Sequence, residues 1–107
     1  MNIPDKIKIG GKVYRVEITN KMDLGISNVS AEILYNELLI RVSPQAQGKM
    51  EADFLHEVIH AILDHLGYKD HDEKRVDEMA QSFYMIIQDN PEMFAPSKKT
   101  ERKEETM

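Results

Sequence analysis

The spacing of apolar residues changes halfway along this chain, from every second residue to every third or fourth. Apolar and polar residues alternate at 6–9 and 13–18, whereas helical spacing begins after about Gln47. A period of two is typical of half-buried strands, and a period near 3.6 is typical of amphipathic helices. Strands followed by helices in one short chain predict an α+β fold.

The first half predicts two antiparallel hairpins. Gly10-Gly11 separates the first two alternating runs, and a Gly-Gly pair in that position is typical of a tight turn. A second strand pair is expected at 31–35 and 38–42, with its turn at Asn36-Glu37. Residues 20–30 show little periodicity and are expected to form a loop.

The second half predicts two helices, from about Gln47 to Leu66 and from about His71 to Gln88, with a stop at Gly67. Their apolar stripes are expected to be Leu55, Val58, Ile59, Ile62 and Leu66 in the first, and Val76, Met79, Ala80, Phe83 and Ile87 in the second. We expect an antiparallel helix pair on which the two hairpins pack.

Composition narrows the class of protein further. The 107 residues, 41% of them hydrophobic, suffice for a single domain, expected at 1–95. The charged remainder, 96–107, is expected to be a disordered tail. A net charge of −5 without a basic patch argues against a nucleic-acid partner, and the absence of cysteine excludes disulfides and thiolate metal sites.

Targeting signals are not evident in the sequence. The N-terminus lacks the apolar run of a signal peptide, and no segment has the roughly 20 apolar residues of a membrane span. We therefore expect a cytoplasmic protein without a membrane partner.

The first predicted helix carries His56-Glu57-Val58-Ile59-His60, which has the form H-E-x-x-H. Residues four apart share a helix face, so His56 and His60 can point two imidazoles at one metal ion. Glu57 lies between them, where it can act as general base on a metal-bound water. This is the arrangement of a zinc metallopeptidase. The alternative is a surface helix with two incidental histidines.

A catalytic zinc site needs a third protein ligand. The acidic and histidine residues that follow the motif are Asp64, His65, His71, Glu73, Asp77 and Glu78. In a helix pair folded near Gly67, position 73 lies opposite position 60, and position 77 lies opposite position 56. We therefore expect Glu73 to be the third ligand and Asp77 to accept a hydrogen bond from the spare N–H of His56.

Two other interpretations of these residues stay open. Asp70-x-x-Glu73 has the form of a capping box, which would make Glu73 a residue that starts a helix. Asp77 could then face solvent. His71 is expected at the turn, too far from His56 to share its ion.

These residues resemble a known family. HEVIH, followed on a later helix by Glu73 and then Asp77, is similar to the small zincin metallopeptidases. The likeness is greatest to short phage and prophage proteins related in form to the ImmA/IrrE-type metallo-endopeptidases, and the opening KIKIGGKVYRV and the closing FYMIIQDNPEMF also fit it. The resemblance implies a zinc-dependent, gluzincin-like hydrolase with His56, His60 and Glu73 as ligands and Glu57 as base.

The chain departs from that family in three respects. Val76 stands where relatives often carry alanine, and Asp53 precedes the motif where many zincins have a small or uncharged residue. The chain is also short, without an obvious further subdomain to wall a substrate cleft.

The leading hypothesis is a zinc peptidase acting on an intracellular protein or peptide. The alternatives are a catalytically inactive, zinc-stabilised zincin scaffold that binds a partner, and an interaction protein without metal. The candidates for an oxyanion hydrogen bond are Tyr35, Tyr68 and Tyr84, each of which could instead be a packing residue. Strand 38–42 could be an edge that binds an extended peptide, or part of the core sheet.

Overall fold

A computed structural model of the chain describes residues 1–22 and 30–95. The expected tail at 96–107 and most of the expected loop at 20–30 lie outside the described residues. The elements are, in order, β1 (Lys6–Ile9), β2 (Lys12–Ile18), β3 (Ala31–Leu34), the 3-10 turn η1 (Tyr35–Glu37), β4 (Leu39–Val42), α1 (Gln47–His65), α2 (Glu73–Asp89) and the 3-10 turn η2 (Pro91–Phe94). The predicted α+β class is confirmed.

The four strands form one mixed sheet in the order β1-β2-β4-β3. Both expected hairpins are present, because β1 pairs with β2 and β3 with β4, each antiparallel. The hairpins join through β2 and β4, which run parallel. β4 is therefore an inner strand, and the interpretation of 38–42 as a peptide-binding edge is wrong.

Gly10 and Gly11 make the tight turn between β1 and β2, as predicted. Their φ angles are +58° and +89°, and Ile9 pairs directly with Lys12 across the turn. A two-residue turn with positive φ at both positions matches the twist of the flanking strands, and glycine adopts it without a steric penalty.

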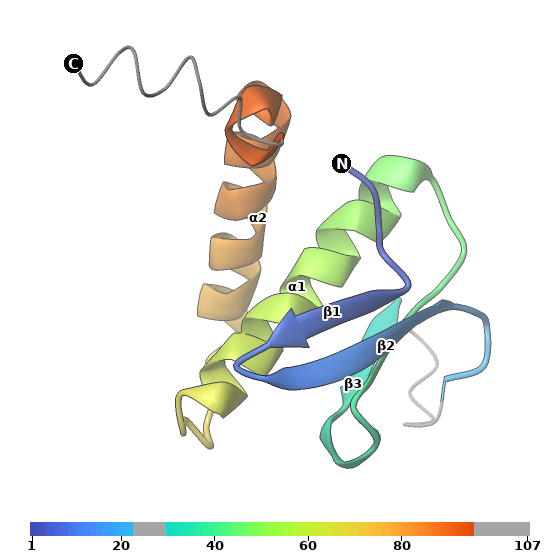
Figure 1. The fold of residues 1–107 in the computed structure, drawn as a ribbon, viewed down its shortest axis with the longest axis vertical. Helices are drawn as coiled ribbons and strands as arrows, with labels where there is room; N and C mark the ends of the chain where they lie inside the picture. Colours follow the sequence, from blue (N-terminus) through green and yellow to red (C-terminus); the bar gives the residue numbers. More distant parts are fainter. Residues whose placement is uncertain (23–29, 96–107) are drawn as a thin grey trace.

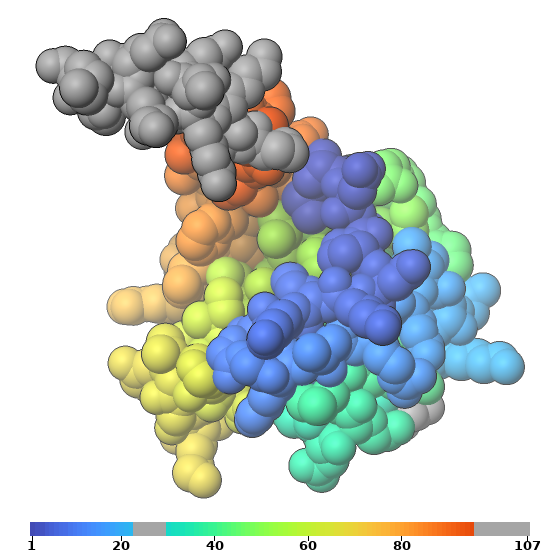
Figure 2. All heavy atoms as spheres, viewed as in Figure 1, coloured from blue at the N-terminus to red at the C-terminus, as the bar shows by residue number. Residues whose placement is uncertain are grey.

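The two helices have different environments. α1 packs against the sheet, contacting β1, β3 and β4, and α2 packs against α1 (Figure 1). The β1–β2 hairpin covers part of α1 from one side, while α2 stands beside α1 with much of its surface open (Figure 2). In the described part of the chain, neither helix is long and apolar enough to cross a membrane.

The buried stripes of both helices differ from those expected. On α2, Val76 and Ala80 are buried, whereas Met79 and Phe83 are 42% and 47% exposed. Because α2 packs chiefly against one helix, it needs a narrower apolar face than a helix lying on a sheet.

On α1, Leu55, Val58 and Ile59 are buried as expected, whereas Ile62 and Leu66 are exposed. Phe54 and Ala61 take their place in the core because α1 is covered from two directions, by the sheet and by α2.

The connection between the helices places the start of α2. Gly67, with φ +93°, ends α1 in a left-handed conformation, as predicted. α2 begins at Glu73 instead of His71, and its N-cap is Asp72, whose side chain accepts hydrogen bonds from the backbone N–H groups of Lys74 and Arg75. A cap at Asp70 is therefore wrong, but Glu73 does start the helix, as that alternative implied.

Candidate metal centre

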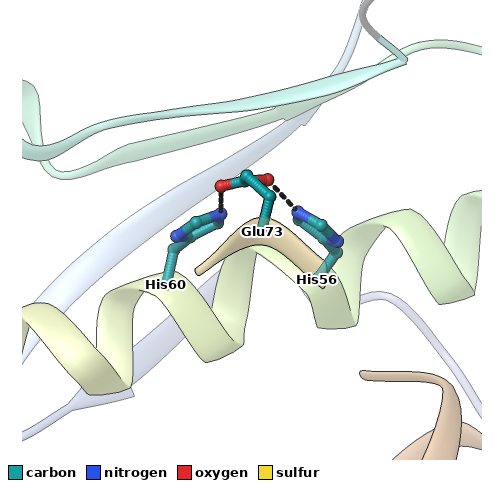
Figure 3. A group of neighbouring side chains, drawn as sticks. All are labelled: His56, His60 and Glu73. Atoms are coloured by element: carbon teal, nitrogen blue, oxygen red, sulfur yellow. Dashed lines mark hydrogen bonds and ion pairs between the residues drawn. The ribbon is translucent and has the colours of Figure 1, made fainter. Parts of the chain in front are cut away.

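Three side chains from two helices meet beside the helix connection. His56 and His60 come from successive turns of α1, and Glu73 is the first residue of α2. The Glu73 carboxylate lies between the two imidazoles, with Oε1 3.2 Å from His56 Nε2 and Oε2 2.8 Å from His60 Nε2 (Figure 3). The structure thus brings together the three residues that the sequence predicted as metal ligands.

The geometry and donor chemistry of this group suit a divalent metal ion. One ligand atom from each residue lies within 4.8 Å of the other two. Bonds of about 2.0 to 2.1 Å in a tetrahedral zinc site put neighbouring ligand atoms roughly 3.3 Å apart, so small side-chain shifts would close the group around an ion. The Glu73 side chain is 68% exposed, which leaves one side of the group open to solvent. Two imidazoles and a carboxylate also suit other divalent ions, so this geometry does not identify the metal.

Asp77 lies on the far side of His56 from Glu73, one helical turn along α2. Its Oδ1 is 3.5 Å from His56 Nδ1, while His56 Nε2 faces Glu73. Asp77 thus lies at the expected nitrogen, but 3.5 Å is long for a hydrogen bond. Its side chain is 60% exposed, in line with the alternative that Asp77 faces solvent.

His71 also contacts the group, which the sequence interpretation missed. Its Nδ1 lies 2.8 Å from Nδ1 of His60. The expectation that His71 sits in the turn is confirmed, because it lies between α1 and α2. The missed signal is that His60 lies near the C-terminal end of α1, within reach of side chains from the connection that follows.

Glu57, the predicted general base, is only 7% exposed. The pKa of its carboxyl is raised to about 7, chiefly by burial and also by the nearby Glu73, Asp53 and Glu32 carboxylates, while His56 acts in the opposite direction. No hydrogen bond reaches its carboxylate from the residues at 1–22 and 30–95. Glu57 is therefore a buried carboxyl that titrates near neutral pH.

The charge state of His60 suits metal binding. Burial lowers the pKa of its imidazole, although the adjacent Glu73 carboxylate acts in the opposite direction. A neutral imidazole offers a lone pair to a metal ion, whereas the imidazolium form does not.

Of the three candidate tyrosines, Tyr35 has the strongest electrostatic link to the group. Burial raises the pKa of its phenol to about 12, and the carboxylates of Glu57 and Glu73 contribute to the shift. Tyr68 is 60% exposed. Tyr84 donates a 2.9 Å hydrogen bond to the buried Glu51.

The remaining candidates from the sequence, Asp64, His65 and Glu78, are not in the ligand group.

A hollow of about 310 Å³ occurs elsewhere on α2, lined by Arg75, Glu78, Met79, Ser82, Phe83 and Ile86. Position 75 lies about 200° around α2 from position 73. The hollow is therefore on another face of α2 from the metal group, which consists of His56, His60 and Glu73.

Comparison of the chain with family models, curated proteins and solved structures gave no match. The resemblance to the small zincin metallopeptidases therefore stays a prediction from the motif. The class of site that the geometry defines is a His-His-Glu group able to hold a metal ion, joining two helices of an α+β domain.

Proposed function

We propose that this protein is a zinc-dependent metallopeptidase that hydrolyses a peptide bond in an intracellular protein. The observation that carries the proposal is the meeting of His56, His60 and Glu73 within 4.8 Å. Two histidines and one glutamate form a ligand set used by catalytic zinc sites, which keep a fourth position open. The H-E-x-x-H spacing and the buried Glu57 support a catalytic role over a purely structural one, because holding zinc does not require Glu57.

The residues around the group have distinct roles in this proposal. When bound, zinc supplies a Lewis acid that polarises the scissile carbonyl and acidifies water. Glu57 accepts the proton of the attacking water at its carboxylate and passes it to the leaving amine. Tyr35 stays protonated at neutral pH, so its hydroxyl can donate a hydrogen bond to the developing oxyanion.

Metal content tests the first part of this proposal. We expect about one zinc ion per chain by elemental mass spectrometry, on protein purified without an affinity tag or chelator. Glu73→Ala should lose the metal because it removes one of three ligands, whereas Glu78→Ala, on another face of α2, should keep it. Protein that takes up no zinc, even when zinc is offered and the excess removed, would contradict the proposal.

Hydrolysis is tested separately with Glu57→Gln. This variant keeps the size of the side chain but cannot accept the proton, so cleavage should fall by roughly 10² to 10⁴-fold while the zinc content stays the same. Cleavage is followed by mass spectrometry on a peptide library. Zinc binding without Glu57-dependent cleavage would favour the catalytically inactive scaffold.

A further inference from the structure

His71 bridges the metal group and the backbone of the helix connection. Its Nδ1 lies 2.8 Å from Nδ1 of His60, and its Nε2 lies 2.9 Å from the carbonyl oxygen of Tyr68. His60 faces Glu73 through its other ring nitrogen, Nε2. Figure 3 shows that Nδ1 lies on the opposite side of the His60 ring from the nitrogen that contacts Glu73.

The two imidazoles meet edge to edge. Their centroids are 5.1 Å apart and their planes differ by 22°. When two ring nitrogens are 2.8 Å apart, the ring centroids are farthest from each other if the nitrogens point straight at each other. The observed centroid distance of 5.1 Å is close to that maximum. The contact therefore has the direction of a hydrogen bond and not of ring stacking.

The Tyr68 carbonyl fixes the direction of this chain of contacts. A carbonyl oxygen only accepts hydrogen bonds, so Nε2 of His71 carries the hydrogen. In neutral His71, Nδ1 is then bare and accepts a hydrogen bond from Nδ1–H of His60. While no metal is bound, the 2.8 Å contact with Glu73 needs a hydrogen on Nε2 of His60 as well, because a carboxylate only accepts hydrogen bonds. A metal ion at Nε2 would replace that hydrogen and leave Nδ1–H directed at His71.

We propose that His71 is a positioning residue that holds His60 in the tautomer and orientation needed to bind the metal ion. The inference rests on the proposed function, since it assigns the role of His71 relative to that metal. His71 lies at Nδ1 of His60, and Asp77 lies at Nδ1 of His56, so each contacts the ring nitrogen that does not face Glu73. His71 is not a ligand of the same ion, because the His60 ring separates it from the ligand atoms.

Zinc affinity of the full chain tests this role. His71→Phe keeps a planar ring but offers no acceptor, and should weaken zinc binding by roughly 10- to 100-fold, as loss of a ligand-orienting partner does. His71→Asn places a carbonyl oxygen near the position of Nδ1 and should recover most of the affinity. Binding is measured by competition with a chromophoric chelator. If His71→Phe does not fold, His71→Ala replaces it in the comparison with His71→Asn.

The controls separate this inference from the proposed function. His65→Phe, whose ring lies against Gly10 away from the ligands, should bind zinc as the unchanged protein does. Equal zinc affinity in His71→Phe and the unchanged protein would overturn the role of His71 and leave the metallopeptidase proposal standing. Absence of zinc binding by the unchanged protein would overturn both.

A spectroscopic measurement distinguishes a positioning residue from a ligand. The visible absorption bands of the Co²⁺-loaded protein report the number and type of ligands, so they should keep their positions in His71→Phe at saturating Co²⁺. Shifted bands in that variant, with unshifted bands in His65→Phe, would show that His71 coordinates the ion, and would overturn the inference.

Discussion

Glu57 shows how far burial changes the chemistry of one carboxyl group in this protein. It lies between two histidines in sequence, yet its pKa rises because the loss of solvent outweighs the effect of His56. A carboxyl that titrates near pH 7 is suited to exchange protons at neutral pH. The same shift must lower the free energy of unfolding of the metal-free protein at every pH at which Glu57 is ionised.

The pH dependence of stability should reveal this shift. The folded-state pKa of about 7 lies above the ordinary value of 4.5, so the folded state holds the proton more tightly. Stability attributable to Glu57 is complete below pH 4.5 and is lost as the pH rises to about 7, by roughly 3 kcal/mol. We expect the metal-free Glu57→Gln variant to gain stability relative to the unchanged protein over that interval.

Chemical denaturation at a series of pH values, with a chelator present, measures this difference. The chelator matters because a nearby divalent cation would itself lower the pKa of Glu57. A stability difference that stays constant between pH 4.5 and 8 would show that Glu57 is not perturbed.

The first two turns of α2 carry much of the site, since the helix begins at Glu73 and Asp77 lies one turn later. Its N-terminus is fixed by Asp72, whose Oδ1 accepts hydrogen bonds from the backbone N–H groups of Lys74 at 3.1 Å and Arg75 at 3.5 Å. Capping satisfies N–H groups that have no partner within the helix. The cap therefore sets where Glu73 stands relative to α1.

Removal of this cap should destabilise the protein. We expect Asp72→Ala to lower the free energy of unfolding by about 1 kcal/mol, and Asp72→Asn to lose less, because asparagine also caps helices well. Asp70→Ala is the matched control and should change stability by less than about 0.5 kcal/mol. Urea denaturation provides the measurement, and equal losses for the two alanine variants would contradict the assignment of the cap.

The metal group joins the two helices of the molecule. α1 is held by the sheet and by α2, whereas α2 rests chiefly on α1 through a narrow buried stripe that includes Val76 and Ala80. An ion held by His56, His60 and Glu73 would link these elements at the end nearest their connection. Because the three side chains come together only in the folded chain, metal binding would be coupled to folding.

Thermal stability should therefore depend on zinc. At a free zinc concentration about 100 times the Kd, binding adds roughly 2.7 kcal/mol, which for a domain of this size raises Tm by on the order of 10 °C. His60→Ala should show little of this rise, while Glu57→Gln should show all of it, because Glu57 is not a ligand. Differential scanning calorimetry with and without zinc measures the shift, and a Tm that does not respond to zinc would argue against the metal site.

The local sequence sufficed to predict the secondary elements and the three residues of the metal group. Strand alternation, the Gly10-Gly11 turn and the stop at Gly67 depend on backbone preferences of a few neighbouring residues. The meeting of Glu73 with His56 and His60 follows from helix periodicity and the length of the connection. These features could be predicted because each depends on short-range geometry.

Contacts between distant segments decided the rest. The parallel pairing of β2 and β4, the exposed Met79 and Phe83, and the contact of His71 with His60 depend on how the elements pack. The elevated pKa of Glu57 likewise needs the solvent exclusion that packing creates. The sequence determined which elements form and which side chains share a helix face, and only the tertiary structure decided what covers those faces, because burial is a property of the assembled molecule.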